Sequence, residues 1–299
     1  MLKITDPSLL NDLPQNNRFI GTLPTLDNSS IIFNGKNNIL YCDEHIHLTN
    51  SILTFNGNNS VIYLCRNKHL YKLDVVTYNN SAFYVGQNNY FNGKLSAILS
   101  EQKHIFIGDD GLFSFGIWMR IADPHLIYHT DSKKRINPTK SIYLGDHVWI
   151  GQSAMILKGT QIHSGSIIGA LSVVSGKEIP SNTSWAGNPS RKIAENIFWT
   201  DKCVHSWIDN QTAENNVCKT DAYTYHYDPK EFIAFSQIDQ KLTDASNSEE
   251  RYAYLTTFTT HKAKNRFTAE NQKNLLQNLF VNYQNYLNKN KVTTRRSMR

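Results

Sequence analysis

Two histidines, His125 and His129, lie four positions apart in a polar stretch of the chain. The ordinary pKa of imidazole is about 6.5, so the neutral ring can accept a proton at physiological pH. An alcohol is a poor nucleophile at that pH and needs such a base, whereas its attack on a thioester needs no metal ion. Either histidine is therefore a candidate general base for acyl transfer to a hydroxyl group.

A large aromatic residue, Trp149, follows these histidines in the chain. An indole ring can simply pack against a neighbouring loop. Alternatively, it can expose its face, and an exposed ring stacks well on the apolar face of a sugar and would orient an acceptor. The residues alone leave both interpretations of Trp149 open.

Four cations, Lys133, Lys134, Arg135 and Lys140, follow the two histidines. A run of charge is most often a solvated surface. Because this run lies beside the candidate base, the alternative is that it binds an anionic acceptor.

His45 and His47 alternate along the chain, so on a strand they would point the same way. Two imidazoles on one face can begin a zinc site, which takes at least three protein ligands. A third histidine in register is not apparent, and we therefore expect no metal ion.

A period of six residues predicts the architecture that positions these side chains. An aliphatic residue recurs at every sixth position: Leu144, Ile150, Ile156, Ile162, Ile168 and Val174. Smaller residues follow each of the first five: Val148, Ala154, Thr160, Ser166 and Ser172. A helix with about 3.6 residues per turn would spread this period over all its faces. The pattern instead predicts a three-sided solenoid, in which each side is a short strand with its aliphatic residue inside a narrow prism.

The same phase appears at Ile107, Phe113 and Met119, then stops, and resumes at Leu144. Residues 120–141 must therefore leave the prism as a loop, and both candidate histidines belong to it. Long insertions in solenoids are usually functional.

The repeat is less regular upstream, where Phe-Asn-Gly occurs at 33–35, 55–57 and 91–93. Asn and Gly suit sharp corners because they tolerate positive φ. We predict an N-terminal cap over residues 1–29 and a β-helix domain over residues 30–194, from which the loop 120–141 projects. Residues 195–299 lose the period and are predicted to form an extension with α-helices, one capped by Ser248 and one following Thr268.

The stretch from Asp123 to Ile193 resembles the hexapeptide-repeat acyltransferases. The residues that carry the resemblance are Asp123-Pro124-His125, Asp146-His147-Val148-Trp149-Ile150-Gly151, Gly169-Ala170-Leu171-Ser172-Val173-Val174 and Trp185-Ala186-Gly187-Asn188-Pro189. The run from Ser114 to Arg120 and the long tail are most similar to bacterial capsular polysaccharide O-acetyltransferases of the polysialic acid type. Leu171 stands where the family has a small glycine, and Gly176 moves the following lysine by one place.

This resemblance implies an all-β solenoid of a particular kind, a left-handed parallel β-helix that assembles as a homotrimer. It implies acetyl-CoA as co-substrate, bound between adjacent prisms, with no metal ion. His125 matches the catalytic histidine of the family, and Trp149 would orient the acetyl group and the acceptor.

The resemblance also suggests which residues bind the two substrates. For CoA they are Ala170, Ser175, Lys177, Trp185, Arg191 and Lys192, with cations meeting phosphates and the other side chains meeting the pantetheine arm and adenine. An ordinary solvated surface is the alternative for the two lysines and the arginine. For the acceptor, we predict contacts with Asn92, Lys133, Lys134 and Arg135.

The formal net charge of +6 favours an anionic partner, and both CoA and an acidic polysaccharide qualify. No nucleic-acid recognition module is visible. None of the four cysteines forms a CxxC pair, so we expect free, mostly buried thiols. No apolar run approaches the ~20 residues that cross a bilayer, and the first residues lack the apolar core of a signal peptide. We expect a cytoplasmic protein that could touch the inner face of the inner membrane.

These features together predict an O-acetyltransferase that modifies a hydroxyl group of an acidic, sialic-acid-containing capsular polysaccharide. One alternative is an N- or O-acetyltransferase of a nucleotide sugar or another small molecule. A β-helix that binds glycan without catalysis is a further alternative, but a histidine at the long break in the repeat argues against it. The basic loop and the long tail favour a polymeric acceptor.

Overall fold

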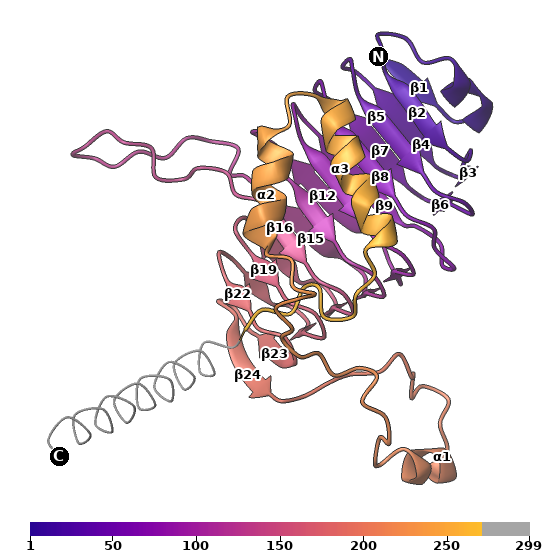
Figure 1. Ribbon diagram of the computed structural model, residues 1–299, viewed down its shortest axis with the longest axis vertical. Coiled ribbons are helices and arrows are strands. Elements are labelled where there is room, and N and C mark those ends of the chain that lie inside the picture. The colour runs from indigo at the N-terminus through magenta and orange to yellow at the C-terminus, as the bar shows by residue number, and fades with distance from the viewer. Residues whose placement is uncertain (271–299) are drawn as a thin grey trace, which may run out of the picture.

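The computed structural model describes residues 1–270 of the chain. It shows a three-sided stack of short strands with helices from the C-terminal region along one side (Figure 1). The predicted all-β solenoid with a helical C-terminal region is therefore confirmed. The chain visits sheet 2, sheet 3 and sheet 1 in turn, and each corner is named below after the two sheets that it joins.

Sheet 1 consists of β1 (Leu2–Ile4), β4 (Ser30–Phe33), β7 (Ile52–Phe55), β9 (Leu73–Thr77), β12 (Leu95–Leu99), β15 (Ile117–Arg120), β18 (Met155–Leu157) and β21 (Val173–Val174). Sheet 2 consists of β2 (Arg18–Gly21), β5 (Ile39–Cys42), β8 (Val61–Leu64), β10 (Ala82–Val85), β13 (Ile105–Ile107), β16 (Ile142–Leu144), β19 (Gln161–Ile162) and β22 (Glu178–Ile179). Sheet 3 consists of β11 (Tyr90–Phe91), β14 (Leu112–Phe113), β17 (Trp149–Ile150), β20 (Ile167–Ile168), β23 (Thr183–Ala186) and β24 (Arg191–Glu195). β3 (Thr25–Asp27) and β6 (His47–Thr49) form a two-stranded sheet on this third side, nearer the N-terminus.

The strand pairs are parallel except at the two ends of the stack, where β1 pairs with β4 and β23 with β24 in antiparallel fashion. A 3-10 helix at Pro7–Asn11 separates β1 from β2. β2 and β3 already pair in parallel with β5 and β6. The solenoid thus begins at Arg18, inside the 1–29 segment for which we predicted a cap.

Two coil lengths explain why the repeat is clear in one half of the chain and irregular in the other. Paired strand residues in neighbouring coils are mostly 22 residues apart before the loop, as for Ser30 and Ile52. They are 18 residues apart in the first coil after it, as for Tyr143 and Gln161, which equals three hexapeptides. The rings of Phe33 and Phe55 accordingly stack 4.7 Å apart on sheet 1. The third triplet differs, because Phe91 lies on sheet 3, where its ring is 5.1 Å from that of Phe113.

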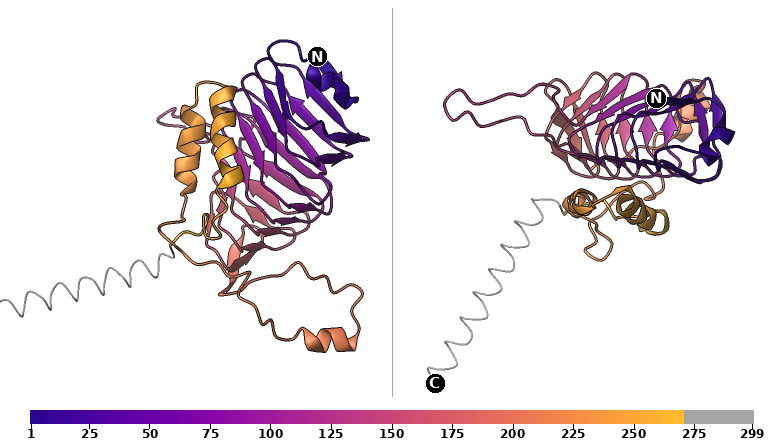
Figure 2. Two further views of the ribbon diagram at one scale, coloured as in Figure 1. Left: turned by 45° about the vertical axis from the view of Figure 1, so that its right-hand side comes forward. Right: turned by 90° about the horizontal axis from the view of Figure 1, so that it is seen from above.

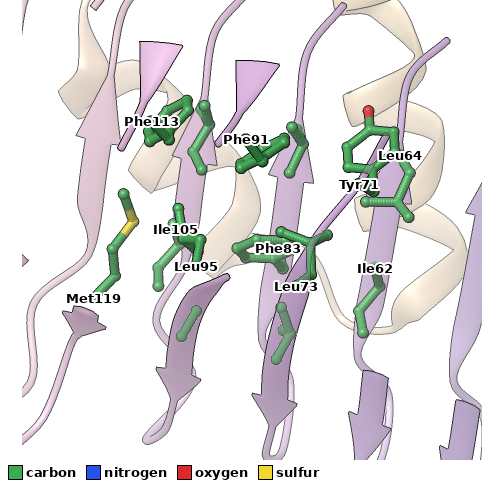
Figure 3. Close-up of a cluster of buried hydrophobic side chains, with 14 of the residues drawn as sticks. Ile62, Leu64, Tyr71, Leu73, Phe83, Phe91, Leu95, Ile105, Phe113 and Met119 are labelled. Atoms are coloured by element: carbon green, nitrogen blue, oxygen red, sulfur yellow. The ribbon is translucent and has the colours of Figure 1, made fainter. Parts of the chain in front are cut away.

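The interior of the prism is a continuous column of apolar side chains. All six aliphatic positions of the repeat are fully buried there, as predicted: Leu144, Ile150, Ile156, Ile162, Ile168 and Val174. Larger side chains fill the upstream coils, and Figure 3 shows Phe83, Phe91 and Phe113 facing aliphatic residues such as Leu95 and Ile105. Burying a side chain of this size stabilises a fold by about 1.5–3 kcal/mol, so each coil strengthens the stack.

A second core covers the outer surface of sheet 2. Helices α2 (Phe235–Asp244) and α3 (Ser248–Thr260) pack there against outward-facing aromatic residues (Figures 1 and 2). Among these, Tyr63, Tyr84 and Phe106 are buried although they point away from the prism. A strand that is buried on both faces has an unbroken apolar sequence, as in Val61–Leu64. Such runs in the sequence indicate the second core.

The helices of the extension differ in detail from those predicted. The expected helix at Ser248 is present as α3, but its cap is Asn247, whose side chain accepts from the Glu250 N–H at 2.9 Å. Ser248 instead donates its hydroxyl to the Asn37 carbonyl. A short helix, α1 (Asp209–Glu214), lies in an excursion away from the solenoid, and the helix expected after Thr268 falls outside the described residues. Within residues 1–270 no helix is long and apolar enough to cross a membrane.

A buried ion-pair network ties the extension to the 2–3 corner. Arg266 is only 1% exposed, and its guanidinium donates two hydrogen bonds of 2.8 Å to the carboxylate of Asp146. The same guanidinium lies 2.9 Å from Asp109, which also pairs with Lys262 at 2.6 Å. Burial raises the pKa of Asp146 although Arg266 acts to lower it, so these cations offset part of the cost of burying carboxylates.

We predict that Arg266→Met lowers the free energy of unfolding by ~3–5 kcal/mol, because it leaves a buried carboxylate without its partner while roughly preserving side-chain volume. Urea denaturation followed by circular dichroism measures the change. Lys262→Met is the matched control and should cost less than ~1 kcal/mol, since Lys262 is more exposed. Equal losses in the two variants would contradict this assignment.

Candidate functional site

The loop between β15 and β16 leaves the solenoid at the 1–2 corner, where the break in the repeat placed it. It is closed at its base by the Lys140 N–H, which donates to the Ile121 carbonyl at 3.2 Å. Further out it forms a narrow hairpin, in which Tyr128 bridges Arg135 in antiparallel fashion. Figures 1 and 2 show this hairpin extending away from the stack into solvent.

Arg135 ties the hairpin to the solenoid instead of facing solvent. Its guanidinium donates to both carboxylate oxygens of Glu101 at 2.8 and 2.9 Å, and the Thr139 hydroxyl donates to the same carboxylate. These hydrogen bonds, that from Arg135 first, lower the pKa of Glu101 to about 2. Because its charge is already paired, this geometry does not support the expected contact of Arg135 with an anionic acceptor.

We predict that Glu101→Gln loosens the hairpin without unfolding the solenoid. Trypsin should then cleave after Lys133 and Lys134 faster than in the wild type, while the melting temperature changes little. Because the pKa of Glu101 is depressed, its hydrogen bonds to Arg135 and Thr139 stabilise the hairpin fully above the unfolded-state pKa of about 4.3. This stabilisation is lost as the pH falls towards 2 and the carboxylate is protonated. Cleavage at an unchanged rate would show that Glu101 does not hold the loop.

The structure distinguishes the two candidate bases. The backbone carbonyl of His125 accepts a hydrogen bond from the Asn137 side chain at 2.7 Å, which positions the residue. Among the described residues, the imidazole of His125 has no hydrogen-bond partner, and it is exposed. The Nδ1 atom of His129 instead accepts from the Asp131 N–H at 3.3 Å, inside the hairpin. His125 is thus the histidine whose ring nitrogens are both available.

Asp123 also belongs to the base of the loop. Its carboxylate accepts from Lys158 Nζ at 2.5 Å and from the Asn137 side chain at 3.2 Å, which fixes the loop segment that carries His125 to the next coil. These hydrogen bonds, that from Lys158 first, lower the pKa of Asp123. The resemblance drew attention to Asp123, but Lys158 and Asn137 were not identified from the sequence.

Trp149 lies on another side of the prism from the loop. It is in β17 on sheet 3, whereas the loop leaves at the 1–2 corner, and it is 37% exposed. Its ring centroid is 5.9 Å from that of Trp199 in the C-terminal extension. Trp149 therefore does not pack against the loop of its own chain, and one subunit alone does not bring it together with His125.

Trp199 forms a reciprocal pair with His147 that the sequence did not reveal. The two rings stack 3.8 Å apart, the His147 ring hydrogen-bonds to the Trp199 carbonyl, and the Trp199 Nε1–H donates to the His147 carbonyl at 3.0 Å. Burial lowers the pKa of His147, so this imidazole stays neutral and structural. The pair anchors the start of the extension beside Trp149. His147 and Trp199 are 52 positions apart in the chain, so no local sequence pattern indicates their contact.

The predicted CoA-binding residues lie around the C-terminal end of the solenoid. Ser175 and Lys177 are at the 1–2 corner, two coils below the base of the loop. Ala170 is at the 3–1 corner, on the other edge of sheet 1. Next to it, Leu171 has the left-handed φ of 58° and is 73% exposed, which shows that the leucine in the place of glycine points into solvent.

The remaining three lie at the end of the stack. Arg191 and Lys192 are exposed on β24, and Lys192 pairs with Glu195. Trp185 is partly buried against the core of the prism, and its indole N–H donates to the Thr183 hydroxyl at 3.1 Å. Arg191 and Lys192 therefore present cations at the surface, whereas Trp185 closes the end of the prism, so an adenine contact is less well supported.

An exposed apolar column runs along the outside of sheet 1 between these corners. Trp118, Met155 and Val173 are in register on three successive strands, and the first two are exposed. An apolar, uncovered sheet face between two rows of polar corner residues suits a long ligand or a second protein surface.

The acceptor residues predicted from sequence do not form one cluster within a chain. Lys133 and Lys134 are exposed at the tip of the hairpin. Asn92 is exposed at the 3–1 corner, where its carbonyl accepts from Lys72 Nζ at 2.9 Å. His45 occupies a turn with φ of 60°, so it does not alternate with His47 on a strand, and residues 1–270 contain no group of three metal-binding side chains.

Comparison with known proteins agrees with this geometry. Residues 141–176 match the sequence model described as bacterial transferase hexapeptide, six repeats. The polysialic acid O-acetyltransferase of Escherichia coli O1:K1 is 32% identical over 133 residues, which cover 44% of this chain and 43% of that protein. The crystal structure of the polySia-specific acetyltransferase NeuO superposes with a TM-score of 0.56 and 28% identity, over 67% of this chain and 93% of that one.

Residues 141–176 carry the hexapeptide repeat of bacterial transferases, and the chain is similar to O-acetyltransferases built on that repeat. The galactoside O-acetyltransferase of Escherichia coli K12 is a further relative, 31% identical over 137 residues, which cover 46% of this chain and 64% of that protein. The chain thus matches less than two thirds of the length of these curated relatives.

The hexapeptide match also locates what is particular to this chain. It spans only the 18-residue coils that follow the loop. The 22-residue coils upstream and the helices on sheet 2 lie outside it. Functions specific to this protein are therefore to be sought in those parts as well as at His125.

Proposed function

We propose that this protein transfers an acetyl group from acetyl-CoA to a hydroxyl group of an acidic, sialic-acid-containing capsular polysaccharide. The observation that carries the proposal is the exposed, unpaired imidazole of His125 on the loop that interrupts the hexapeptide coils. The relatedness to polysialic acid O-acetyltransferases supports the choice of acceptor. We place the reaction in the cytoplasm, where acetyl-CoA is made.

His125 acts as a general base in direct transfer. A ring nitrogen takes the proton of the acceptor hydroxyl as its oxygen attacks the thioester carbonyl. The C–S bond then breaks, and the departing CoA thiolate takes the proton from the imidazolium. Cys42 and Cys65 are buried, and burial raises the pKa of both thiols, that of Cys65 to about 12, so neither serves as an acyl carrier. Cys203 and Cys218 are exposed in the C-terminal extension, so the expectation of mostly buried thiols holds for only two of the four.

Acetyl-CoA fits the corner residues at the C-terminal end of the stack. Lys177 and Arg191 would offer cations to its phosphates, and Lys192 would do so by exchanging Glu195 for a phosphate. Ala170 and Ser175 would contact the pantetheine arm, which suits the apolar column of sheet 1 between them. Of this set, Ser175 and Lys177 lie at the 1–2 corner, the corner from which the loop of His125 projects, two coils below its base.

The acceptor would lie between the hairpin and Trp149. Lys133 and Lys134 have no carboxylate within ion-pair distance among the described residues, so both charges are available to an anionic glycan. The exposed indole face of Trp149 would stack on a sugar ring. Asn92, at the 3–1 corner, would contact the acceptor further from the reacting hydroxyl.

A complete site requires two subunits, because His125 and Trp149 lie on different sides of one prism. The hairpin that follows His125 supports this view, since four large apolar residues on it are 50–58% exposed: Leu126, Ile127, Tyr128 and Ile136. Such a protruding apolar surface is unfavourable in water and suits burial against a neighbour. We therefore propose a homotrimer, in which the loop of one subunit reaches the next.

We predict that His125→Ala lowers kcat by two to four orders of magnitude, the usual effect of losing a general base. The Michaelis constant for acetyl-CoA and the oligomeric state should persist. His129→Ala is the matched control and should cost much less, because its Nδ1 is engaged within the hairpin. Retention of more than about a third of wild-type kcat in His125→Ala would reject the assignment and make His129 the first candidate.

We also predict that His125→Ala and Trp149→Ala complement each other. Each variant alone should be nearly inactive, but coexpressed subunits should regain activity, because mixed trimers contain interfaces with both wild-type residues. Coexpression of each variant with a second copy of itself is the control. Activity that stays absent in the mixture, or a monomer in sedimentation at micromolar concentration, would contradict a shared site.

A small acceptor is the second candidate, favoured by the match to galactoside O-acetyltransferase. Acetyl transfer to capsular polymers, to free sugars and to nucleotide-activated sugars, compared at equal concentration of acceptor groups, separates the two. Transfer to nucleotide or free sugars alone would establish the small-acceptor function instead.

A further inference from the structure

A hollow of about 450 Å³ opens at the 2–3 corner of the N-terminal coils, in the part of the protein that the hexapeptide match does not reach. Cations and imidazoles dominate its lining, which includes Arg66, Lys68, His45, His47, His69 and Leu70. The upstream coils are four residues longer than the downstream ones. The hollow lies where neighbouring long coils turn from sheet 2 to the third side.

The two fixed charges of this hollow are free to meet a ligand. Within residues 1–270, no carboxylate lies within 4 Å of the Arg66 guanidinium or the Lys68 ammonium, and both side chains are exposed. Two carboxylates lie in the surroundings: Asp43 accepts from the backbone N–H groups of Glu44 and Arg66, at 2.8 and 3.2 Å, and Asp110 interacts electrostatically with Lys68 from beyond ion-pair distance. Arg66 and Lys68 therefore give the hollow a positive character.

Its other groups are of the kind that recognise a sugar. The ring of His69 lies edge-on to that of Tyr90, 4.9 Å away, and beside it Leu70 is 42% exposed. The Nε2 atom of His47 is buried and has no hydrogen-bond partner among the described residues. Apolar and aromatic surface beside polar donors and two cations matches a carboxylated sugar better than it matches a bare inorganic anion.

The hollow is aligned with the proposed acceptor site. Tyr90, Leu112 and Trp149 occupy the same outward position on three successive strands of sheet 3. At ~4.8 Å between strands, Trp149 is roughly 10 Å from Tyr90, the residue against which His69 packs. One extended glycan could therefore cover both places, whereas a single sugar could not.

We propose that this hollow is an accessory subsite, which binds a carboxylated sugar unit of an acidic polymer while another unit lies at Trp149. The proposal rests on the proposed function for its acceptor. Arg66 and Lys68 hold the carboxylate, and the His69, Leu70 and Tyr90 surface supports the ring. The subsite makes the enzyme prefer a polymer over a single sugar, and it does not touch the reacting atoms.

The test compares two double variants. The first combines Arg66→Ala and Lys68→Ala in one chain. The second, the control, combines Lys3→Ala and Lys36→Ala and has the same change in charge. Lys3 and Lys36 are exposed and lie elsewhere, on β1 and at the 1–2 corner. Calorimetry measures binding of long-chain polysialic acid, with dextran as the neutral polymer. Steady-state kinetics uses the same polymer and, separately, N-acetylneuraminic acid.

We expect the Arg66/Lys68 variant to weaken polymer binding about tenfold or more, corresponding to about 1.4 kcal/mol, and to raise the Michaelis constant for the polymer to a similar extent. Its kcat, its Michaelis constant for acetyl-CoA and its kinetics with the monosaccharide should equal those of the wild type. The control variant should change polymer binding by less than about twofold, since distant surface charges are largely screened.

The possible outcomes test the accessory subsite and the proposed acetyltransferase function separately. Equal weakening in both double variants, or none in either, overturns the subsite. Polymer that binds through Arg66 and Lys68 but is never acetylated by the wild type overturns the proposed function and leaves the subsite standing. Acetylation of the polymer with an unchanged Michaelis constant in the Arg66/Lys68 variant removes the subsite alone.

Discussion

The narrow interior of the prism is the constraint on which the rest of this structure depends. Each coil places apolar side chains such as Ile150, Ile156 and Ile162 inside, and its backbone groups bond to the coils on either side. A strand on a flat side cannot gain a residue without turning its side chains over, so extra residues can enter only at corners. The loop of His125, the longer turns upstream and the hollow at Arg66 are all corner features for this reason.

The three outer faces of the prism differ in how far the chain itself covers them, and the open surfaces are those available for binding. Sheet 2 is covered by α2 and α3 and forms a second core. Sheet 3 is partly covered where Trp199 stacks on His147, which leaves Trp149 half-exposed beside it. Sheet 1 is open along Trp118 and Met155. Sheet 1 is therefore the face that we propose for the pantetheine arm of CoA and for contact with a neighbouring subunit.

Charged residues at the surface of the solenoid have two roles. Some are paired and hold parts of the chain together, and others are exposed and unpaired. The buried Arg266 meets two carboxylates, because a desolvated charge must be paired, and it fastens the extension to the 2–3 corner. Glu101 and Arg135 do the same near the surface and hold the hairpin. Elsewhere on the surface, Arg66, Lys68 and Lys133 have no carboxylate within ion-pair distance in residues 1–270 and remain available to anions. A basic sequence thus contains both cations that form structural ion pairs and cations available to bind a ligand, and only their surroundings distinguish the two.

By itself, the sequence determined the solenoid and the position of the loop that carries His125 and His129, because a period of six and its interruption are local in the chain. The choice of His125 as first candidate base came instead from the family resemblance. The sequence also indicated α3, although the cap proved to be Asn247, one residue before Ser248. Only the tertiary structure decided that Trp149 faces away from the loop, that Arg135 is paired with Glu101, and that Trp185 closes the prism. The physical reason is that coil stacking and the returning extension bring together residues tens of positions apart, and neither strand register nor the pairing of a charge is encoded in any short stretch of chain.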